Sequence, residues 1–178
     1  MIQRKQTLFL LLAVCAMAMM FMFPLATFSG TNDRNVEVKA ELNLIAKDNP
    51  QLMEEILNGD TVHMNQKEYI KVWPLVALTL ASGLLALVSI FLYKKRVTQM
   101  RVVSVAFLLE LVNIFLIFIW AVDVYIKKVS VPMACTDTKT TYGVGIWCAI
   151  IGLVMLFLAQ RAIKKDEEKV RAADRLRN

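Results

Sequence analysis

The sequence is poor in the residues that most enzymes use for catalysis or for binding metals. It contains one histidine, His63, and three cysteines, Cys15, Cys135 and Cys148, which lack the spacing of a metal site. It has no glycine-rich loop suited to a phosphate group, and no nucleophile stands near a candidate base. We therefore predict a protein that is not an enzyme, with no catalytic residue, cofactor or metal. Two of the cysteines fall in expected helices, which argues against a disulfide framework.

Long polar stretches are also scarce, since residues 30–71 form the only sizeable one. Hydrophobic residues make up 57% of the 178 residues and occur in blocks of about 20, the length that crosses a bilayer core of roughly 30 Å. The pattern predicts an all-α membrane protein with one domain over residues 1–178. Its expected fold is an antiparallel bundle of four transmembrane helices with a small mixed α/β extracytoplasmic region. The net charge of +6 then reflects basic residues beside the spans, which meet anionic lipid, and we expect no nucleic acid as a partner.

The four spans are expected at about residues 7–28, 73–93, 102–126 and 143–160. The first block follows Arg4 and Lys5, which is also the order of a signal peptide, and Ala26–Gly30 resembles a cleavage site. The apolar run is longer than the usual signal core, and Pro24 falls where a spanning helix would approach the far interface. We therefore expect an uncleaved first span.

The polar region 30–71 is expected to form the extracytoplasmic cap. Val36–Leu44 alternates polar and apolar residues, which predicts a half-buried strand, and Thr61–Met64 suits a second short strand. Asp48-Asn49-Pro50 has the form of a helix start. His63 has no partner ligands near it in the sequence, so we expect it to be solvated.

Basic residues gather in the connection 94–101 and in the tail 161–178. Placing both termini in the cytoplasm puts thirteen basic residues inside and eight outside, as the positive-inside rule requires. The tail has no helix breaker, so the fourth helix is expected to continue through it. The residues expected to contact lipid or a partner are Lys94, Lys95, Arg96, Arg101, Lys164, Lys165, Arg171, Arg175 and Arg177.

Three stretches together resemble one family. They are Met1-Ile2-Gln3-Arg4 with Gln6-Thr7-Leu8-Phe9-Leu10-Leu11-Leu12, the basic turn Lys94–Arg101, and the tail Ile163–Arg177. Over its whole length the chain resembles a family of small four-helix membrane proteins of Bacteroidota, the domain of unknown function 4293. The resemblance implies four transmembrane helices in an inner membrane. It implies no activity, substrate or catalytic residue.

Polar residues inside the third span form the candidate site. Glu110 lies about 12 Å into that span, where a carboxylate costs roughly 2.5–3.5 kcal/mol, and Asn113 shares its face. Suitable hydrogen-bond partners on the second span are Thr79, Ser82, Gly83 and Ser89. Two interpretations stay open. Glu110 is either a neutral, hydrogen-bonded acid that fixes helix pairing, or part of a proton or cation site.

The tail carries seven basic and four acidic residues with a narrow apolar face, which favours a protein contact over membrane insertion. We therefore expect a non-enzymatic scaffold, assembly factor or accessory subunit whose partners are membrane lipids and a membrane or cytoplasmic protein. The alternative is a small transporter or channel that works at Glu110 and Asn113. It would be a homo-oligomer, because four short helices leave little room for a path within one chain.

Overall fold

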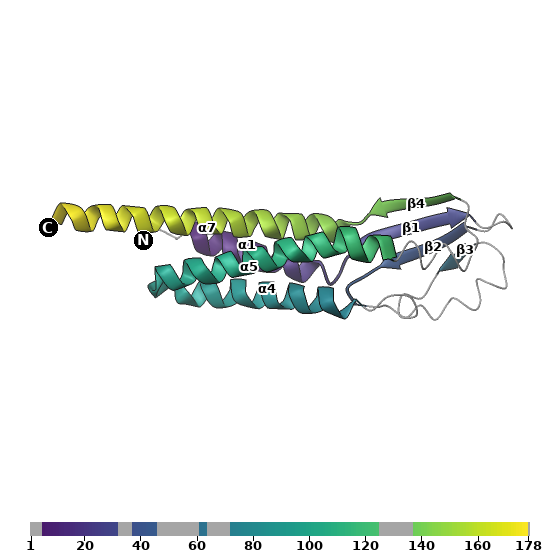
Figure 1. The fold of residues 1–178 in the computed structure, drawn as a ribbon, viewed down its shortest axis with the longest axis horizontal. Helices are drawn as coiled ribbons and strands as arrows, with labels where there is room; N and C mark the ends of the chain where they lie inside the picture. The colour runs from purple at the N-terminus through teal and green to yellow at the C-terminus, as the bar shows by residue number, and fades with distance from the viewer. Residues whose placement is uncertain (1–4, 32–36, 46–60, 64–71, 125–136, 178) are drawn as a thin grey trace. The chain divides into compact units, whose positions relative to one another are not determined.

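The computed structural model describes residues 5–31, 37–45, 61–63, 72–124 and 137–177. The described chain is mostly helical (Figure 1), with helices α1 (Lys5–Met19), α4 (Trp73–Phe91), α5 (Arg96–Leu116) and α7 (Val144–Arg177). Shorter helical turns are η1 (Leu92–Lys94), which is 3-10, and η2 (Ile117–Val122), which is π-helical. The strands are β1 (Ala26–Thr31), β2 (Glu37–Leu42), β3 (Thr61–His63) and β4 (Asp137–Tyr142).

The chain divides into two compact units. The first unit contains residues 1–18, 78–113 and 148–178, which hold most of the four helices. The second contains residues 19–77 and 114–147, which hold the sheet and the adjoining helix ends.

Three helical segments are long and apolar enough to cross a membrane: Trp73–Phe91, Arg96–Val122 and Val144–Val170. Helix α1 is apolar but has 15 residues, so it measures about 22 Å. The prediction of a first helix over residues 7–28 is therefore too long. The helix ends at Met19, and the chain turns before Pro24, whose ring lacks an N–H and disfavours helix in the preceding residue.

In each of the four helices, a row of buried residues is spaced alternately three and four apart, as in helices that pack with a heptad pattern. On α5 they are Gln99, Val103, Ala106, Glu110 and Asn113, and on α4 they are Leu75, Thr79, Ser82, Ala86 and Ser89. On α1 they are Gln6, Leu10, Ala13 and Met17, and on α7 they are Ala149, Gly152, Leu156, Ala159 and Ile163. Most are small or polar, which lets helix backbones approach closely.

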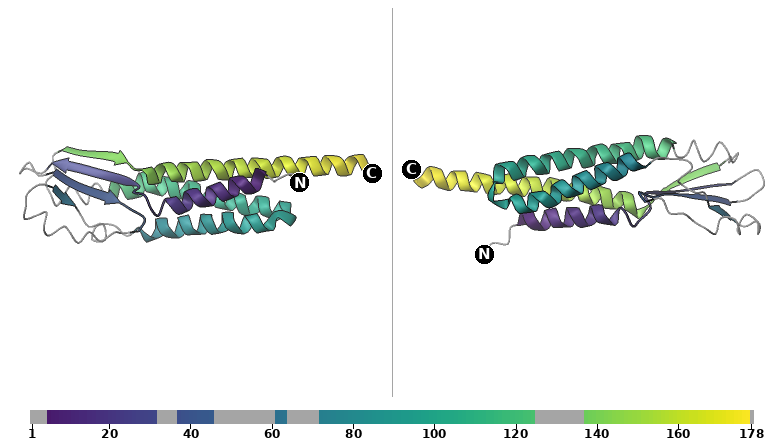
Figure 2. Two further views of the ribbon diagram at one scale, coloured as in Figure 1. Left: turned by 180° about the vertical axis from the view of Figure 1, so that it is seen from behind. Right: turned by 90° about the horizontal axis from the view of Figure 1, so that it is seen from below.

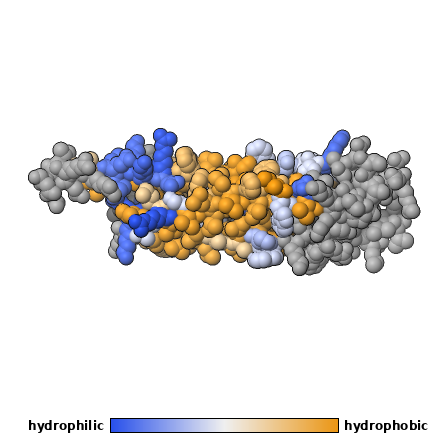
Figure 3. Space-filling model, viewed as in Figure 1, coloured by the Kyte–Doolittle hydropathy of each residue, from blue (hydrophilic) through white to orange (hydrophobic). Residues whose placement is uncertain are grey.

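The outward faces of the helices carry large apolar side chains. Leu84 is 61% exposed, Phe91 72% and Leu108 57%, the reverse of the pattern in a water-soluble protein. Figure 3 shows this hydrophobic surface over the middle of the helices, with hydrophilic residues toward the end formed by η1 and the last part of α7. Lipid is the solvent that suits such a surface.

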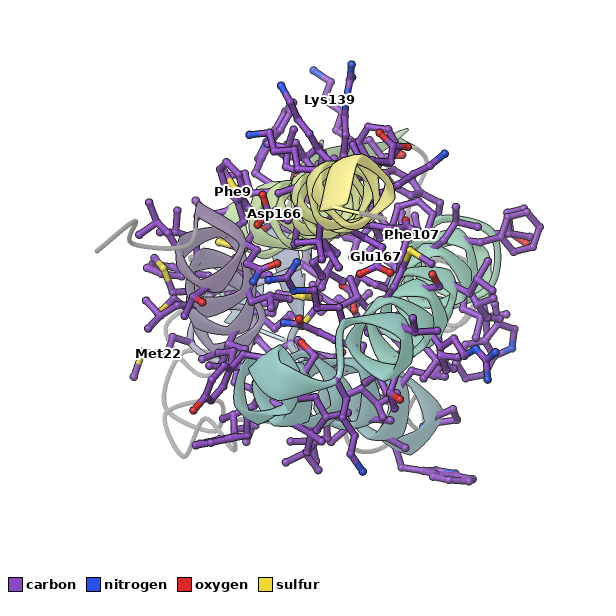
Figure 4. The ribbon with its side chains drawn as sticks, turned by 90° about the vertical axis from the view of Figure 1, so that its left-hand side faces the viewer. Phe9, Met22, Phe107, Lys139, Asp166 and Glu167 are labelled. Atoms are coloured by element: carbon purple, nitrogen blue, oxygen red, sulfur yellow. The ribbon has the colours of Figure 1, made fainter. Side chains whose placement is uncertain are left out.

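Four contacts fix the order of the helices in the first unit. Ser82 on α4 contacts Met17 on α1 and Glu110 on α5. Gln160 on α7 donates a hydrogen bond to Ser104 on α5, and a Cβ on Gly152 of α7 would touch Met17. The cyclic order is therefore α1, α4, α5 and α7, as Figure 4 shows along the helix axes and Figure 2 from two sides.

The second unit contains a four-stranded sheet in the order β3-β2-β1-β4. β1 pairs antiparallel with β2 and β4, and β2 pairs parallel with β3. The two strands predicted within residues 36–44 and 61–64 are confirmed as β2 and β3. β1 and β4 were not predicted, because residues 26–28 were assigned to the first span and residues 137–142 to a loop. The helix expected from Asp48 lies outside the described residues.

The connection predicted at residues 94–101 is mostly helical. α5 begins at Arg96, so Lys95 alone separates it from η1, and Gln99 and Arg101 lie in its first turns. The prediction of a loop there was wrong because basic residues mark a membrane edge without breaking a helix. The continuous fourth helix is confirmed, since α7 runs from Val144 to Arg177 without interruption.

Candidate functional site

The centre of the site is Glu110, which is fully buried on α5. Its Oε2 atom lies 2.7 Å from the Ser82 hydroxyl oxygen on α4. That hydroxyl also lies 3.1 Å from the Thr79 carbonyl oxygen, one turn back on its own helix. Ser82 is itself fully buried, so this network has no exposed member at its core.

The two contacts of Ser82 bear on the proton of Glu110. A serine hydroxyl donates one hydrogen only, and bonding to a carbonyl one turn back is common for serine in helices. The Ser82 hydroxyl donates to Glu110 Oε2 at 2.7 Å, the shorter of its two contacts, and this bond can form whether Glu110 is charged or neutral. None of the lysine, arginine or histidine side chains that the structure describes is buried, so no described cation is at hand to balance a carboxylate. Full burial without a described cation nearby favours a neutral Glu110.

A second bond joins the same two helices one turn further on. The Asn113 Nδ2 atom donates to the Thr79 hydroxyl oxygen at 2.9 Å, and both side chains are buried. Ser82 and Thr79 were predicted as partners for Glu110 and Asn113, and these bonds confirm the pairing. Ser89 was predicted too, but its hydroxyl bonds to the Ala86 carbonyl oxygen at 2.7 Å within α4.

Met17 closes the site from α1. Its sulfur lies 3.6 Å from the Ser82 hydroxyl oxygen. A Cβ added to Gly83 would lie 3.6 Å from that sulfur, and one added to Gly152 would lie 3.6 Å from Met17 Cγ. The two glycines therefore leave room for a long, flexible thioether between helices, a role that methionine fills well.

Several buried polar atoms in the first unit have no hydrogen-bond partner among the described residues. At the site these are Glu110 Oε1 and Asn113 Oδ1. Nearer to η1 they are Gln6 Oε1 and both amide atoms of Gln99. Such atoms are rare in folded proteins and point to a bound species or a functional role. Gln6 and Gln99 were not predicted as site residues, because their spacing of four residues to Leu10 and Val103 marks buried positions only once the inner helix faces are known.

Two polar levels therefore exist along the first unit. Gln6 and Gln99 each stand eleven residues before Met17 and Glu110, so they lie about 16 Å from the Glu110 level. Two apolar layers separate the levels: Leu10, Val103 and Ala159, then Ala13, Ala86, Ala106 and Leu156. Ser89 and the Ser104–Gln160 pair, the polar side chains near these layers, bond within the protein. A continuous row of polar side chains is absent from this part of the described interior.

A family model matches residues 2–176, described as Domain of unknown function (DUF4293). The chain belongs to the DUF4293 family. No curated protein and no solved structure matches it.

In this DUF4293 protein the predicted contact residues gather at one end of the first unit. Lys95, Arg101, Lys164 and Lys165 are exposed. Arg96 is half-buried, with Nη1 donating to the Asp166 carbonyl oxygen of α7 at 3.4 Å. The backbones of Lys94, Arg171, Arg175 and Arg177 are helical, while their side chains lie outside the described part.

Proposed function

We propose that this chain is a multi-pass protein of the inner membrane that acts through protein contacts, as a scaffold, assembly factor or accessory subunit, and is not an enzyme. The observation that carries the proposal is the length of α7. Its 34 residues measure about 51 Å, well beyond a hydrocarbon core of roughly 30 Å. The excess is charged, and it stands beside the basic start of α5, where Arg96 bonds to it. A rigid arm of this kind suits docking of a protein.

The proposed topology is a bundle of four spans with both termini in the cytoplasm. α4, α5 and α7 have the length for three crossings, and α1 lies lengthwise against α4 and α7 in the first unit (Figures 1 and 2). The start of α1 lies toward the end where α7 finishes (Figure 1), and the exposed basic residues Lys95, Arg101 and Lys164 lie in or beside helix segments near that end. Local thinning of the bilayer accommodates a short helix at modest cost.

The apolar layers favour contacts over conduction. An ion that moves between Glu110 and the basic end must pass Leu10, Val103, Ala106 and Leu156, which offer no ligand. Passage through such a constriction carries a high desolvation cost. An interior of this kind stabilises the packing of the helices, and contacts with other proteins are then made by the outer surface.

The test is crosslinking and mass spectrometry in native membranes, with full-length protein and a variant lacking residues 164–178. We expect both to insert into the membrane and only the full-length chain to retain a stable partner. As a matched variant, Arg171→Ala/Arg175→Ala/Arg177→Ala should keep the helix and remove three positive charges. It therefore distinguishes the contribution of the helical extension to docking from the contribution of its charge. Identical partner lists for the full-length and truncated chains would end the docking proposal.

The second candidate function is a small oligomeric transporter or channel. The unpartnered Glu110 Oε1 and Asn113 Oδ1 favour it, since buried acceptors in a membrane helix commonly mark ion or proton sites. Flux of protons or cations into liposomes, compared between wild type and Glu110→Gln, tests it. The transporter is excluded if neither protein supports flux, or if both support the same flux.

A further inference from the structure

We propose that Glu110, Asn113, Ser82 and Thr79 form an intramembrane binding site for a single monovalent cation, sodium being the probe, and that the cation replaces the proton of Glu110. Binding goes beyond the contact function and requires no passage of ions across the membrane. The site is assigned from its unpartnered oxygens, its ligand chemistry and its charge balance.

The oxygens that lack a partner are acceptors. Glu110 Oε1 and Asn113 Oδ1 belong to fully buried side chains one turn apart on the same face of α5. Facing them from α4 are the Ser82 and Thr79 hydroxyls, held by bonds of 2.7 and 2.9 Å. A site that offers carboxyl, amide and hydroxyl oxygens suits a hard cation, whereas soft metals prefer sulfur and nitrogen ligands.

Charge selects a monovalent ion. The described site holds one carboxyl group, and a low-dielectric interior disfavours net charge. A proton on Glu110 leaves the site neutral. A sodium ion beside the Glu110 carboxylate also leaves it neutral, provided that the proton departs to water. A divalent ion would leave one positive charge buried and unbalanced.

The helices packed around the site provide few other titratable groups, so Glu110 is the group expected to exchange the proton. α1 presents Met17, and α4 has no titratable side chain along its length. α7 presents Gly152, with the buried Cys148 one turn away as the other titratable group in the described interior near this level. Cys148 therefore needs its own control.

The experiment uses the full chain, purified and placed in lipid nanodiscs. Unfolding temperature is followed as sodium chloride replaces choline chloride at constant ionic strength, at one mildly acidic and one mildly alkaline pH. A ligand that binds the folded state stabilises it by RT ln(1 + [L]/Kd). We expect the unfolding temperature of the wild type to rise with sodium, and to rise more at the alkaline pH, where fewer protons compete.

Variants assign the effect to the site. Glu110→Gln should lose the response to sodium, and Asn113→Ala should bind radioactive sodium about tenfold more weakly, the equivalent of roughly 1.4 kcal/mol. Cys148→Ala and Ser89→Ala should respond as the wild type does. Direct binding should reach one sodium per chain, with one proton released for each sodium bound.

Two results overturn the proposal. One is a wild type that binds no sodium at either pH, which would leave Glu110 as a hydrogen-bonded acid only. The other is undiminished sodium binding in Glu110→Gln and Asn113→Ala. Binding is read from isotope and unfolding temperature, and docking from crosslinked partners, so failure of one proposal is distinguishable from failure of the other.

Discussion

At the scale of single residues, Ser82 and Ser89 occupy equivalent buried positions on α4 but make different hydrogen bonds. Both are fully buried on the same face of α4, seven residues apart, and both contact a carbonyl three residues back. Ser82 alone also reaches another helix, at Glu110 Oε2. The difference makes the two serines a matched pair for measuring what the interhelical bond contributes.

We expect Ser82→Ala to lower the free energy of unfolding by about 0.5–2 kcal/mol, because it leaves Glu110 Oε2 without its partner. Ser89→Ala should change it by less than about 0.5 kcal/mol, since its bond competes with the helix backbone. Reversible denaturation in mixed micelles measures both. Equal losses for the two variants would show that the Ser82–Glu110 bond adds nothing.

Substitutions of Glu110 separate its neutral form from its charge. Glu110→Gln keeps a neutral polar group of the same length, so the unfolding temperature in sodium-free buffer should stay close to that of the wild type. Glu110→Leu removes the bond to Ser82 and should lower it, by an amount that corresponds to about 1 kcal/mol. A Leu variant as stable as the wild type would contradict a role for Glu110 in pairing α4 with α5.

At the scale of elements, the glycines divide into two kinds. Gly143 and Gly145 stand where the chain leaves β4 and enters α7, and their N–H groups donate to the Leu25 and Pro24 carbonyls at 2.8 and 2.9 Å. A Cβ on Gly145 would lie 2.9 Å from the Phe23 and Pro24 oxygens, and one on Gly143 would collide with the Pro24 oxygen. A side chain at Gly143 or Gly145 would therefore force the backbone around Pro24 to move.

We therefore expect Gly145→Ala to destabilise the protein by about 1–3 kcal/mol, since the carbonyls it meets have little freedom to move. Gly152→Ala, in the same helix, meets only ordinary contacts of 3.6 Å and longer, and should stay within about 0.5 kcal/mol of the wild type. Unfolding temperature and the yield of folded protein in detergent measure the difference. A tolerated alanine at position 145 would contradict this packing.

Elements with a local signal could be predicted from the sequence, and those defined by distant partners could not. The alternation of polar and apolar residues in 36–44 predicted β2, and the absence of a helix breaker in the tail predicted that α7 continues through it. β1 and β4 pair across more than a hundred residues, and neither segment alternates apolar and polar residues clearly, although three threonines of Asp137–Tyr142 favour a strand. The end of α1 at Met19 was obscured because the apolar run continues to Phe23.

The candidate site was partly predictable for the same reason. Glu110 and Asn113 stood out because polar residues inside an apolar run are costly, and small hydroxyl residues on α4 were the natural partners. Gln6 and Gln99 stood next to basic residues, where a polar side chain is unremarkable at a membrane edge. Only their place on the buried helix faces distinguishes them, and that requires knowing which faces meet.

At the scale of the whole molecule, the helices carry large apolar side chains on their outward faces and mostly small or polar ones on their inward faces. One repeating sequence pattern therefore suits both contact with lipid and close packing between helices. Trp73 and Tyr93 are exposed near the two ends of α4, as interface aromatics are. The exposed basic residues Lys95, Arg101, Lys164 and Lys165 lie in or beside the helix segments at one end of the first unit. These features set the proposed orientation.

We predict that a fluorescent protein fused after Asn178 will fluoresce in the cytoplasm, and that a phosphatase fused there, which needs export to be active, will be silent. The same pair fused before Met1 should give the same result if α1 crosses the membrane. A cytoplasmic C-terminus with an exported N-terminus would limit the chain to the three crossings made by α4, α5 and α7.

The position of β1 inside the sheet has a consequence for synthesis. β1 pairs with β2 on one side almost as soon as it is made, but its other side belongs to β4, about a hundred residues later. At roughly 5–20 residues per second, one edge of β1 waits about 5–20 s for its partner. During that interval a row of unbonded N–H and C=O groups is open to any passing strand. Synthesis of β4 is thus the event that covers the open edge of β1, and slowing translation between α4 and β4 should raise aggregation.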